Sequence, residues 1–247
     1  MSGPRLLLHC GCVAFIAAGS LLPLAAAAAD SRCHGTVAHG SIEDSVKLPL
    51  SGPNFEAYSA LGAALGRTHV HSKVAEVLGA AYAAMAVAVP DARFVYGETG
   101  WPSGGRLRPH RTHQNGLSVD FFVPVRDAAG RSVPLPTTAT RRFGYDIEFD
   151  AQGRYEDLSI DFTAMAEHLH QLHLAARARG VRIALVIFDP PLLPRLFATP
   201  RGPYLTQNLR FMSGRAWVRH DEHYHVDFDV PCEPGGAVSA GDARQAR

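Results

Sequence analysis

The stretch His110-Arg-Thr-His-Gln-Asn-Gly-Leu-Ser-Val-Asp-Phe-Phe-Val123 carries the strongest fold signal in the chain. Its Asn115-Gly116 pair is typical of a tight turn. The β-rich run Leu117–Val123 that follows is apolar on both faces, which predicts a strand inside a sheet. Asp120 interrupts this run. Because a bare charge in an apolar strand is costly, Asp120 is expected to bind a cation or to accept strong hydrogen bonds.

A second window, His220-Asp-Glu-His-Tyr-His225, follows much later in the chain. Together the two windows contain five of the 13 histidines. Polar and apolar residues alternate from His223 to Val230, which predicts another strand with His223 and His225 on one face. Neutral imidazoles combined with one carboxylate are typical of catalytic zinc sites, in which one coordination position stays open for water.

Three side chains from distant segments are the candidate zinc ligands: His113, Asp120 and His225. This set would leave a tetrahedral zinc ion one open position, and the water bound there would lose its proton near neutral pH. His223, on the same strand face as His225, is then the candidate general base or transition-state stabiliser. Glu222 is the alternative base if the strand begins after it.

Other histidines have weaker claims to a site role. His110 and His220 are candidates for binding a substrate carboxylate or for orienting the metal ligands through hydrogen bonds. His69-Val-His71 lies where a helix is expected to begin, so capping and solvation are the favoured interpretation. The three histidines within residues 168–173 do not share one helix face, which favours a solvated helix.

The N-terminal sequence predicts export. Residues 1–29 have a short basic start at Arg5, an apolar stretch and small residues before Asp30, as in a secretory signal peptide; an uncleaved anchor is the alternative. Cleavage would leave Cys33 and Cys232 as the two remaining cysteines, and an oxidising compartment favours their pairing as a disulfide. Zinc binding by this pair is less favoured, because neither has a Cys or His partner at metal-site spacing.

Charge and composition exclude some partners. Loss of residues 1–29 removes one arginine and no acid, which takes the formal charge from +1 to zero. No overall electrostatic field remains to attract nucleic acid or acidic membranes. Nucleic acid is therefore not an expected partner, and stable membrane insertion is not expected once the signal is removed.

Helices and strands are mixed without a regular βαβ rhythm, which favours an α+β fold with a mainly antiparallel sheet and the zinc site at the sheet face. Residues 126–143 are turn-rich and predict an exposed insertion, and 145–158 predict a hairpin. One domain is expected over 30–232, with a loose tail at 233–247. Helices are predicted over 70–89 and 161–179, and further strands over 93–97 and 181–188.

The stretch Gly104–Asp120, together with His220-Asp-Glu-His-Tyr-His-Val226, resembles the penicillin-insensitive murein endopeptidases. This family belongs to a wider group of zinc peptidases that includes D-Ala-D-Ala carboxypeptidases and lysostaphin-type enzymes. The group is marked by H-x6-D followed by H-x-H, and the resemblance covers residues 47–232. It implies a small antiparallel sheet flanked by helices. It also implies that the zinc ligands are His113, Asp120 and His225. The implied catalytic histidine is His223, and the implied accessory histidines are His110 and His220.

The resemblance further implies hydrolysis of peptide cross-links in peptidoglycan, typically D-alanyl–meso-diaminopimelyl bonds, in the periplasm. Two alternatives remain open. One is a D,D- or L,D-carboxypeptidase on the same scaffold, which would trim a terminal residue. The other is a non-catalytic peptidoglycan-binding module that retains a metal. The chain departs from the family in its cysteines, because members often carry several disulfides and this mature chain can form one.

Overall fold

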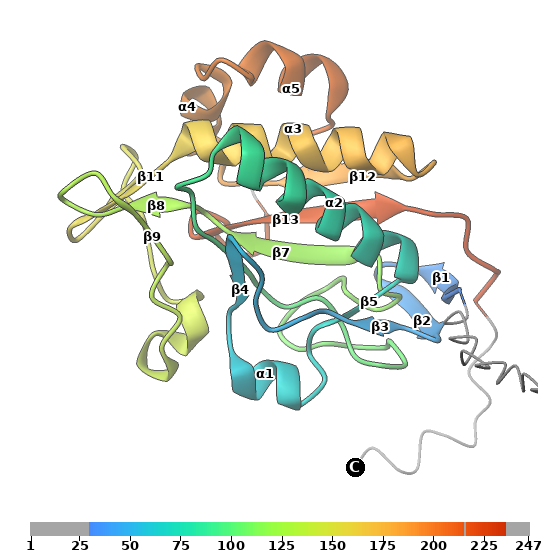
Figure 1. Cartoon of the computed structure of the whole chain (residues 1–247). Coiled ribbons are helices and arrows are strands. Elements are labelled where there is room, and N and C mark those ends of the chain that lie inside the picture. Colours follow the sequence, from blue (N-terminus) through green and yellow to red (C-terminus); the bar gives the residue numbers. More distant parts are fainter. Residues whose placement is uncertain (1–29, 215, 236–247) are drawn as a thin grey trace, which may run out of the picture.

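The computed structural model describes residues 30–214 and 216–235 (Figure 1). The expected signal peptide at 1–29 and residues 236–247 of the expected tail lie outside this part. A five-stranded sheet forms the centre, and its only parallel pair among the described strands is β4 with β6. The predicted α+β fold with a mainly antiparallel sheet is therefore confirmed. In sheet order the strands are β12 (Arg182–Ile187), β13 (His223–Asp229), β7 (Ser118–Phe122), β6 (Phe94–Tyr96) and β4 (Phe55–Ala57).

Two long helices cover one face of this sheet (Figure 1). They are α2 (Ser72–Ala88) and α3 (Phe162–Ala178), which pack against each other. His71 caps α2 by accepting a hydrogen bond from the backbone N–H of Lys73, and Asp161 caps α3 in the same way. The predicted helices are confirmed, and so is the capping role of His71, but the expected solvation of that residue is wrong because His71 is buried.

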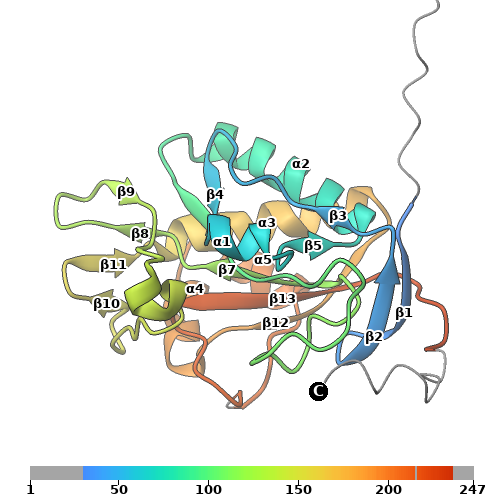
Figure 2. The same cartoon turned by 90° about the horizontal axis from the view of Figure 1, so that it is seen from below.

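The two faces of β13 have different environments. Tyr224 faces α3, because its hydroxyl is hydrogen-bonded to Nδ1 of His168 on that helix. His223 and His225 therefore lie on the opposite face of the sheet, since side chains alternate along a strand. Figure 2 shows that face, where the chain between β6 and β7 runs in front of the sheet.

A smaller, four-stranded sheet accounts for the turn-rich region. Residues 126–143 are exposed or partly exposed except Leu135, as expected of an exposed insertion, and they also contribute short strands to this sheet. The expected hairpin over 145–158 is wrong in its bounds, because the paired strands begin only at Arg154 and end at Ile160. The elements here are β8 (Val125–Arg126), β9 (Ser132–Val133), the 3-10 segment η1 (Ala139–Gly144), β10 (Arg154–Tyr155) and β11 (Leu158–Ile160).

The remaining elements are short. No helix within residues 30–214 or 216–235 combines the length and apolar composition needed to cross a membrane. The short elements are β1 (Arg32–Thr36) and β2 (His39–Glu43), paired as a hairpin; β3 (Val46–Lys47) and β5 (His69–Val70), also paired; α1 (Ala60–Ala64); η2 (Pro190–Leu192); α4 (Leu193–Phe197); and α5 (Gly202–Asn208).

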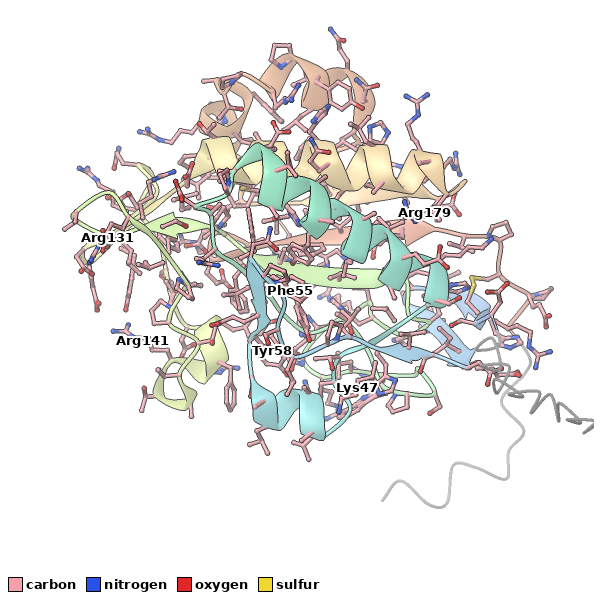
Figure 3. The ribbon with its side chains drawn as sticks, viewed as in Figure 1. Lys47, Phe55, Tyr58, Arg131, Arg141 and Arg179 are labelled. Carbon is pink, nitrogen blue, oxygen red and sulfur yellow. A yellow bond between two sulfur atoms is a disulfide. The ribbon has the colours of Figure 1, made fainter. Side chains whose placement is uncertain are left out.

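A disulfide between Cys33 and Cys232 joins β1 to the segment that follows β13, and its sulfur atoms are yellow in Figure 3. Glu233 extends this connection, because its backbone N–H donates to the carbonyl of Cys33 and its carbonyl accepts from Gly35. The two ends of the described chain are therefore held together by one covalent bond and two hydrogen bonds.

The prediction of a solvated helix over residues 168–173 is wrong for His168 and His170, which are both buried. The ring of His168 packs against those of Tyr82 and Phe94, with centroids 5.2 Å from each. His168 lies on the side of α3 that packs on the sheet, against Phe121 and Tyr224. On the side of α3 that faces away from the sheet, α4 and α5 form a third layer (Figure 1), and Tyr204 of α5 packs on His170. A helix enclosed on both sides needs no single apolar face, so periodicity alone did not identify it.

Replacement of His168 by phenylalanine should reduce the acid sensitivity of the fold. Burial lowers the pKa of His168 to about 3, whereas an unfolded histidine titrates near about 6.5. Between these values the unfolded chain binds a proton that the folded protein excludes. The free energy of unfolding should therefore fall as pH drops, by up to about 1.4 kcal/mol per pH unit from this residue.

Urea denaturation between pH 6 and pH 4 measures this slope. His168→Phe should make the slope of unfolding free energy against pH shallower by the contribution of one proton. Tyr224→Phe, which keeps the titrating ring of His168, should lower stability and preserve the slope. Equal slopes in the wild type and His168→Phe would contradict the assignment of this proton to His168.

Candidate metal centre

Strand register brings the first two donors together. Asp120 on β7 lies directly opposite His225 on β13, so their side chains project from the same face as a cross-strand pair. Oδ1 of Asp120 is 2.9 Å from Nδ1 of His225, and both residues are buried. A shift of one residue in register would move one of them to the helix-covered face.

His113 reaches the same point from the loop before β7. Its Nε2 lies 3.2 Å from Oδ1 of Asp120 and 3.1 Å from Nδ1 of His225. The backbone of His113 is left-handed, with φ of 69°, a conformation that is costly for a residue other than glycine. The backbone N–H of His113 donates to the hydroxyl of Ser118 at 3.3 Å, which helps to hold this conformation.

The three donor atoms fit a tetrahedral ion. Zinc bonds of about 2.0–2.2 Å place neighbouring ligand atoms about 3.3–3.6 Å apart. The distances among His113 Nε2, Asp120 Oδ1 and His225 Nδ1 are 2.9–3.2 Å. The three atoms would therefore need to move apart by only a few tenths of an ångström to reach that geometry. Two imidazoles and one carboxylate are also the donor chemistry that zinc prefers.

Hydrogen bonds on the outer side orient both imidazoles. Nδ1 of His113 lies 3.0 Å from the carbonyl oxygen of Thr99, and because a carbonyl only accepts, Nδ1 carries the hydrogen. Nε2 of His225 lies 2.7 Å from Oδ1 of Asp227. Partners of this kind fix the tautomer of metal-binding histidines. They leave Nε2 of His113 and Nδ1 of His225 directed at the shared point.

The electrostatics of His225 couple metal binding to proton release. Burial would lower the pKa of His225, but the charge of Asp227 and the hydrogen bond with Asp120 outweigh it and raise the pKa to about 10. A ligand imidazole must be neutral, so a metal at Nδ1 would displace this proton. Burial lowers the pKa of His113 despite the opposing charge of Asp120, which favours the neutral form of that ring.

His110 lies at the edge of the same cluster. His110, His113 and Asp120 offer ligand atoms that all lie within 4.8 Å of one another, and Nδ1 of His110 is 3.6 Å from Oδ2 of Asp120. Its other nitrogen, Nε2, is 2.6 Å from Oε2 of Glu98. His110 is therefore oriented towards the centre by a carboxylate, as His225 is by Asp227.

Glu98 was not singled out from the sequence, although its position directly after the predicted strand over 93–97 was a signal. The carboxylate is buried and also accepts hydrogen bonds from Tyr58 and Arg67. Burial would raise the pKa of Glu98, but the hydrogen bonds with His110 and Arg67 outweigh it and hold the pKa at about 2. Glu98 is therefore a stable anion beside the cluster.

His223 faces the centre from β13 without joining the three close donors. Its Nε2 lies 3.8 Å from Oδ2 of Asp120, and its Nδ1 lies 2.9 Å from Oε1 of Glu222. Because β13 begins at His223, Glu222 precedes the strand, which was the condition for its use as an alternative base. Its carboxylate, however, is hydrogen-bonded to the imidazole, so it orients His223. Burial lowers the pKa of His223 to about 4 and raises that of Glu222 to about 8.

His220 lies further out, on the wall of the cleft. Its ring packs on that of His223 with centroids 4.6 Å apart, and its Nδ1 is 2.9 Å from the carbonyl of Val218. Trp217 packs edge-on against His220, and the guanidinium of Arg111 lies 5.2 Å from the Trp217 ring. His220 is thus placed to contact a substrate or to support His223.

The cluster opens into a cavity of about 700 Å³. One wall is apolar: Leu61 of α1 and Leu65, which follows that helix, are 59% and 62% exposed, and Phe143 of η1 lines the same cavity. Tyr58, which is labelled in Figure 3, lies beside α1 and also lines the cavity. The other wall includes Trp217. A cavity of this size fits a short peptide segment.

The comparison with known families shows to which family the chain belongs. The model for the penicillin-insensitive murein endopeptidases matches residues 33–245. The chain belongs to this family. The resemblance carried by the histidine motifs is confirmed, and the match is longer than the 47–232 that the motifs suggested. No match was found among curated proteins.

As a member of the murein endopeptidase family, the protein is a peptidase-type hydrolase. Around its cleft the fold assembles His110, His113, Asp120 and both histidines of the last strand. Tyr145 also belongs to this group, because its hydroxyl donates to Oδ2 of Asp120 at 3.0 Å. Nothing in the sequence pointed to Tyr145, which follows η1 in the turn-rich region.

Proposed function

We propose that this murein endopeptidase family member is an exported zinc metallopeptidase. Its substrates would be peptide cross-links of peptidoglycan, of the D-alanyl–meso-diaminopimelyl type. The observation that carries the proposal is the convergence of His113, Asp120 and His225 donor atoms within 2.9–3.2 Å, beside an open cavity that His225 lines. The disulfide and the predicted signal at 1–29 support export to the periplasm. We assign the peptidase domain to residues 30–232.

The zinc ligands in this proposal are His113, Asp120 and His225, with His110 close enough to serve as an additional donor. A bound zinc ion would supply Lewis acidity, which polarises a peptide carbonyl and makes water more acidic. The chain contributes two imidazoles whose outer nitrogens are already hydrogen-bonded to Thr99 and Asp227. Their inner lone pairs are therefore presented without rotation of either ring.

His223 is the proposed catalytic residue. While Nδ1 is hydrogen-bonded to Glu222, Nε2 is free to accept a proton from the attacking water. The same nitrogen can then return the proton to the amine that leaves when the peptide bond breaks. The contact with Glu222 keeps the ring in place during both transfers. Because burial raises the pKa of Glu222 to about 8, its carboxyl group can ionise when the imidazole gains a proton.

The cavity suits a cross-linked peptide. Leu61, Leu65 and Phe143 offer contact area for the methyl groups of alanyl residues, and Arg142 and Arg219, each paired with a carboxylate, also line the cavity. A peptide with small apolar side chains is complementary to the apolar wall. His220 and Trp217 would contact the chain on the other side of the scissile bond.

Digestion of purified muropeptide dimers and monomers tests the function. The mature protein loaded with zinc should convert dimers to monomers, a chelator should stop the reaction, and added zinc should restore it. Trimming of a terminal D-alanine from monomers without loss of dimers would instead identify a carboxypeptidase. Binding to sacculi without release of any fragment would identify a non-catalytic scaffold.

A further inference from the structure

We propose that Tyr145 is a positioning residue that makes Asp120 bind the metal through one oxygen only. The inference rests on the proposed metal site and adds a residue outside the histidine motifs. The tyrosine hydroxyl lies between two groups, 3.0 Å from the backbone nitrogen of Glu98 and 3.0 Å from Oδ2 of Asp120.

The direction of these two hydrogen bonds is determined by chemistry. The backbone N–H of Glu98 can only donate, so the oxygen of Tyr145 accepts there. The hydroxyl hydrogen is then committed to Oδ2 of Asp120, whose carboxylate only accepts. Tyr145 therefore acts as a fixed donor.

The two oxygens of Asp120 consequently have different environments. Oδ1 faces the donor nitrogens of His113 and His225, at 3.2 and 2.9 Å. Oδ2 faces the tyrosine hydroxyl, while Nδ1 of His110 and Nε2 of His223 lie further away, at 3.6 and 3.8 Å. A carboxylate held in this way presents Oδ1 to an ion and keeps Oδ2 occupied by its hydrogen bond.

The backbone that delivers Tyr145 is held in a costly conformation. The three residues before it, Arg142, Phe143 and Gly144, have φ of 46°, 57° and 99°, and two of them carry side chains. Such conformations persist only where the surroundings enforce them, and they are common at functional sites. Here the tyrosine ring packs edge-on against Phe122 and His223, at centroid distances of 5.0 and 5.1 Å.

Gly97 provides the space that the hydroxyl needs. A Cβ at this position would lie 2.7 Å from the hydroxyl oxygen of Tyr145 and 3.0 Å from Cβ of Asp120. The φ of Gly97 is not left-handed, so the requirement is for space and not for conformation. Its N–H also donates to the carbonyl of Asp120 at 2.7 Å. Gly97 at the end of β6, Asp120 and Tyr145 are therefore closely packed against one another.

Loss of the hydroxyl should change the coordination mode. Without a fixed donor on Oδ2, the carboxylate of Asp120 can rotate and offer both oxygens to the ion. Cobalt(II) reports this change, because four-coordinate cobalt absorbs visible light much more strongly than five-coordinate cobalt. The affinity for the metal should fall as well, by about 10- to 100-fold, as is typical when a hydrogen-bonding partner of a metal ligand is removed.

The experiment compares wild type, Tyr145→Phe and Gly97→Ala, each loaded with cobalt, by visible absorption and by competition with a chelator. Both variants should show weaker absorption and lower affinity. The matched control is Tyr204→Phe, because that hydroxyl is hydrogen-bonded to His173 on α3, away from the site; it should match wild type in both measurements.

The two possible failures are distinguishable. A Tyr145→Phe protein with wild-type absorption and wild-type affinity would overturn the positioning role and leave the metal site intact. A wild-type protein that binds no cobalt, or whose binding survives the loss of Asp120, would overturn the metal site on which the inference rests.

Discussion

Replacement of Asp120 by asparagine should abolish metal retention and activity while the protein stays folded. Asp120 is the one carboxylate among the three close donors, and its charge compensates that of a divalent ion. Asparagine keeps the shape and removes the charge. Affinity should fall by more than about 100-fold, since even the outer hydrogen-bonding partner of a ligand typically contributes roughly 10- to 100-fold.

Metal content after dialysis, chelator competition and the muropeptide digest measure this effect. The control is Asp91→Asn, which makes the same chemical change at an exposed position and should behave as wild type. Circular dichroism distinguishes a folded, metal-free protein from an unfolded one. Full zinc occupancy in Asp120→Asn would refute the ligand assignment.

Replacement of His223 by phenylalanine should separate catalysis from metal binding. The ring that packs on Tyr145 and His220 is kept, but the nitrogen that would carry the proton is lost. Proton transfer by a positioned side chain typically contributes about 10²–10⁴-fold, so kcat should fall by that factor. Metal content should be unchanged, because His223 is not among the three close donors.

Glu222→Gln provides the comparison for His223. Glutamine preserves a hydrogen bond to Nδ1 but cannot ionise when the imidazole is protonated, so kcat should fall less than in His223→Phe. Equal metal loss in His223→Phe and Asp120→Asn would instead make His223 a ligand. If kcat were lower in Glu222→Gln than in His223→Phe, Glu222 would be identified as the base.

The sequence was most informative for the long elements. The apolar period of α2 and the strict alternation of β13 are local signals, and both elements lie where these signals predicted them. The β1–β2 hairpin and the strands β8 and β9 before η1 were missed. They are too short to show a period, and the chain direction there depends on left-handed residues such as Phe143, for which no residue-type signal exists.

The site divides in a similar way. The residues of the two histidine windows could be recognised because their types and spacing are unusual for an apolar strand. Glu98 had only its position after the predicted strand over 93–97 as a signal, and Tyr145 had none, because the role of each residue arises from tertiary hydrogen bonds. His168 was misassigned because a helix buried between two layers lacks the polar face by which solvated helices are recognised.

The amino-acid sequence by itself determined which donors are available and on which strand face they lie, because alternation is a property of each segment alone. Tertiary structure decided that Asp120 pairs with His225, that a left-handed His113 reaches both, and that Tyr145 holds the second carboxylate oxygen. These contacts join segments far apart in the chain. Their register depends on how the sheet packs beneath α2 and α3, and no local pattern encodes that packing.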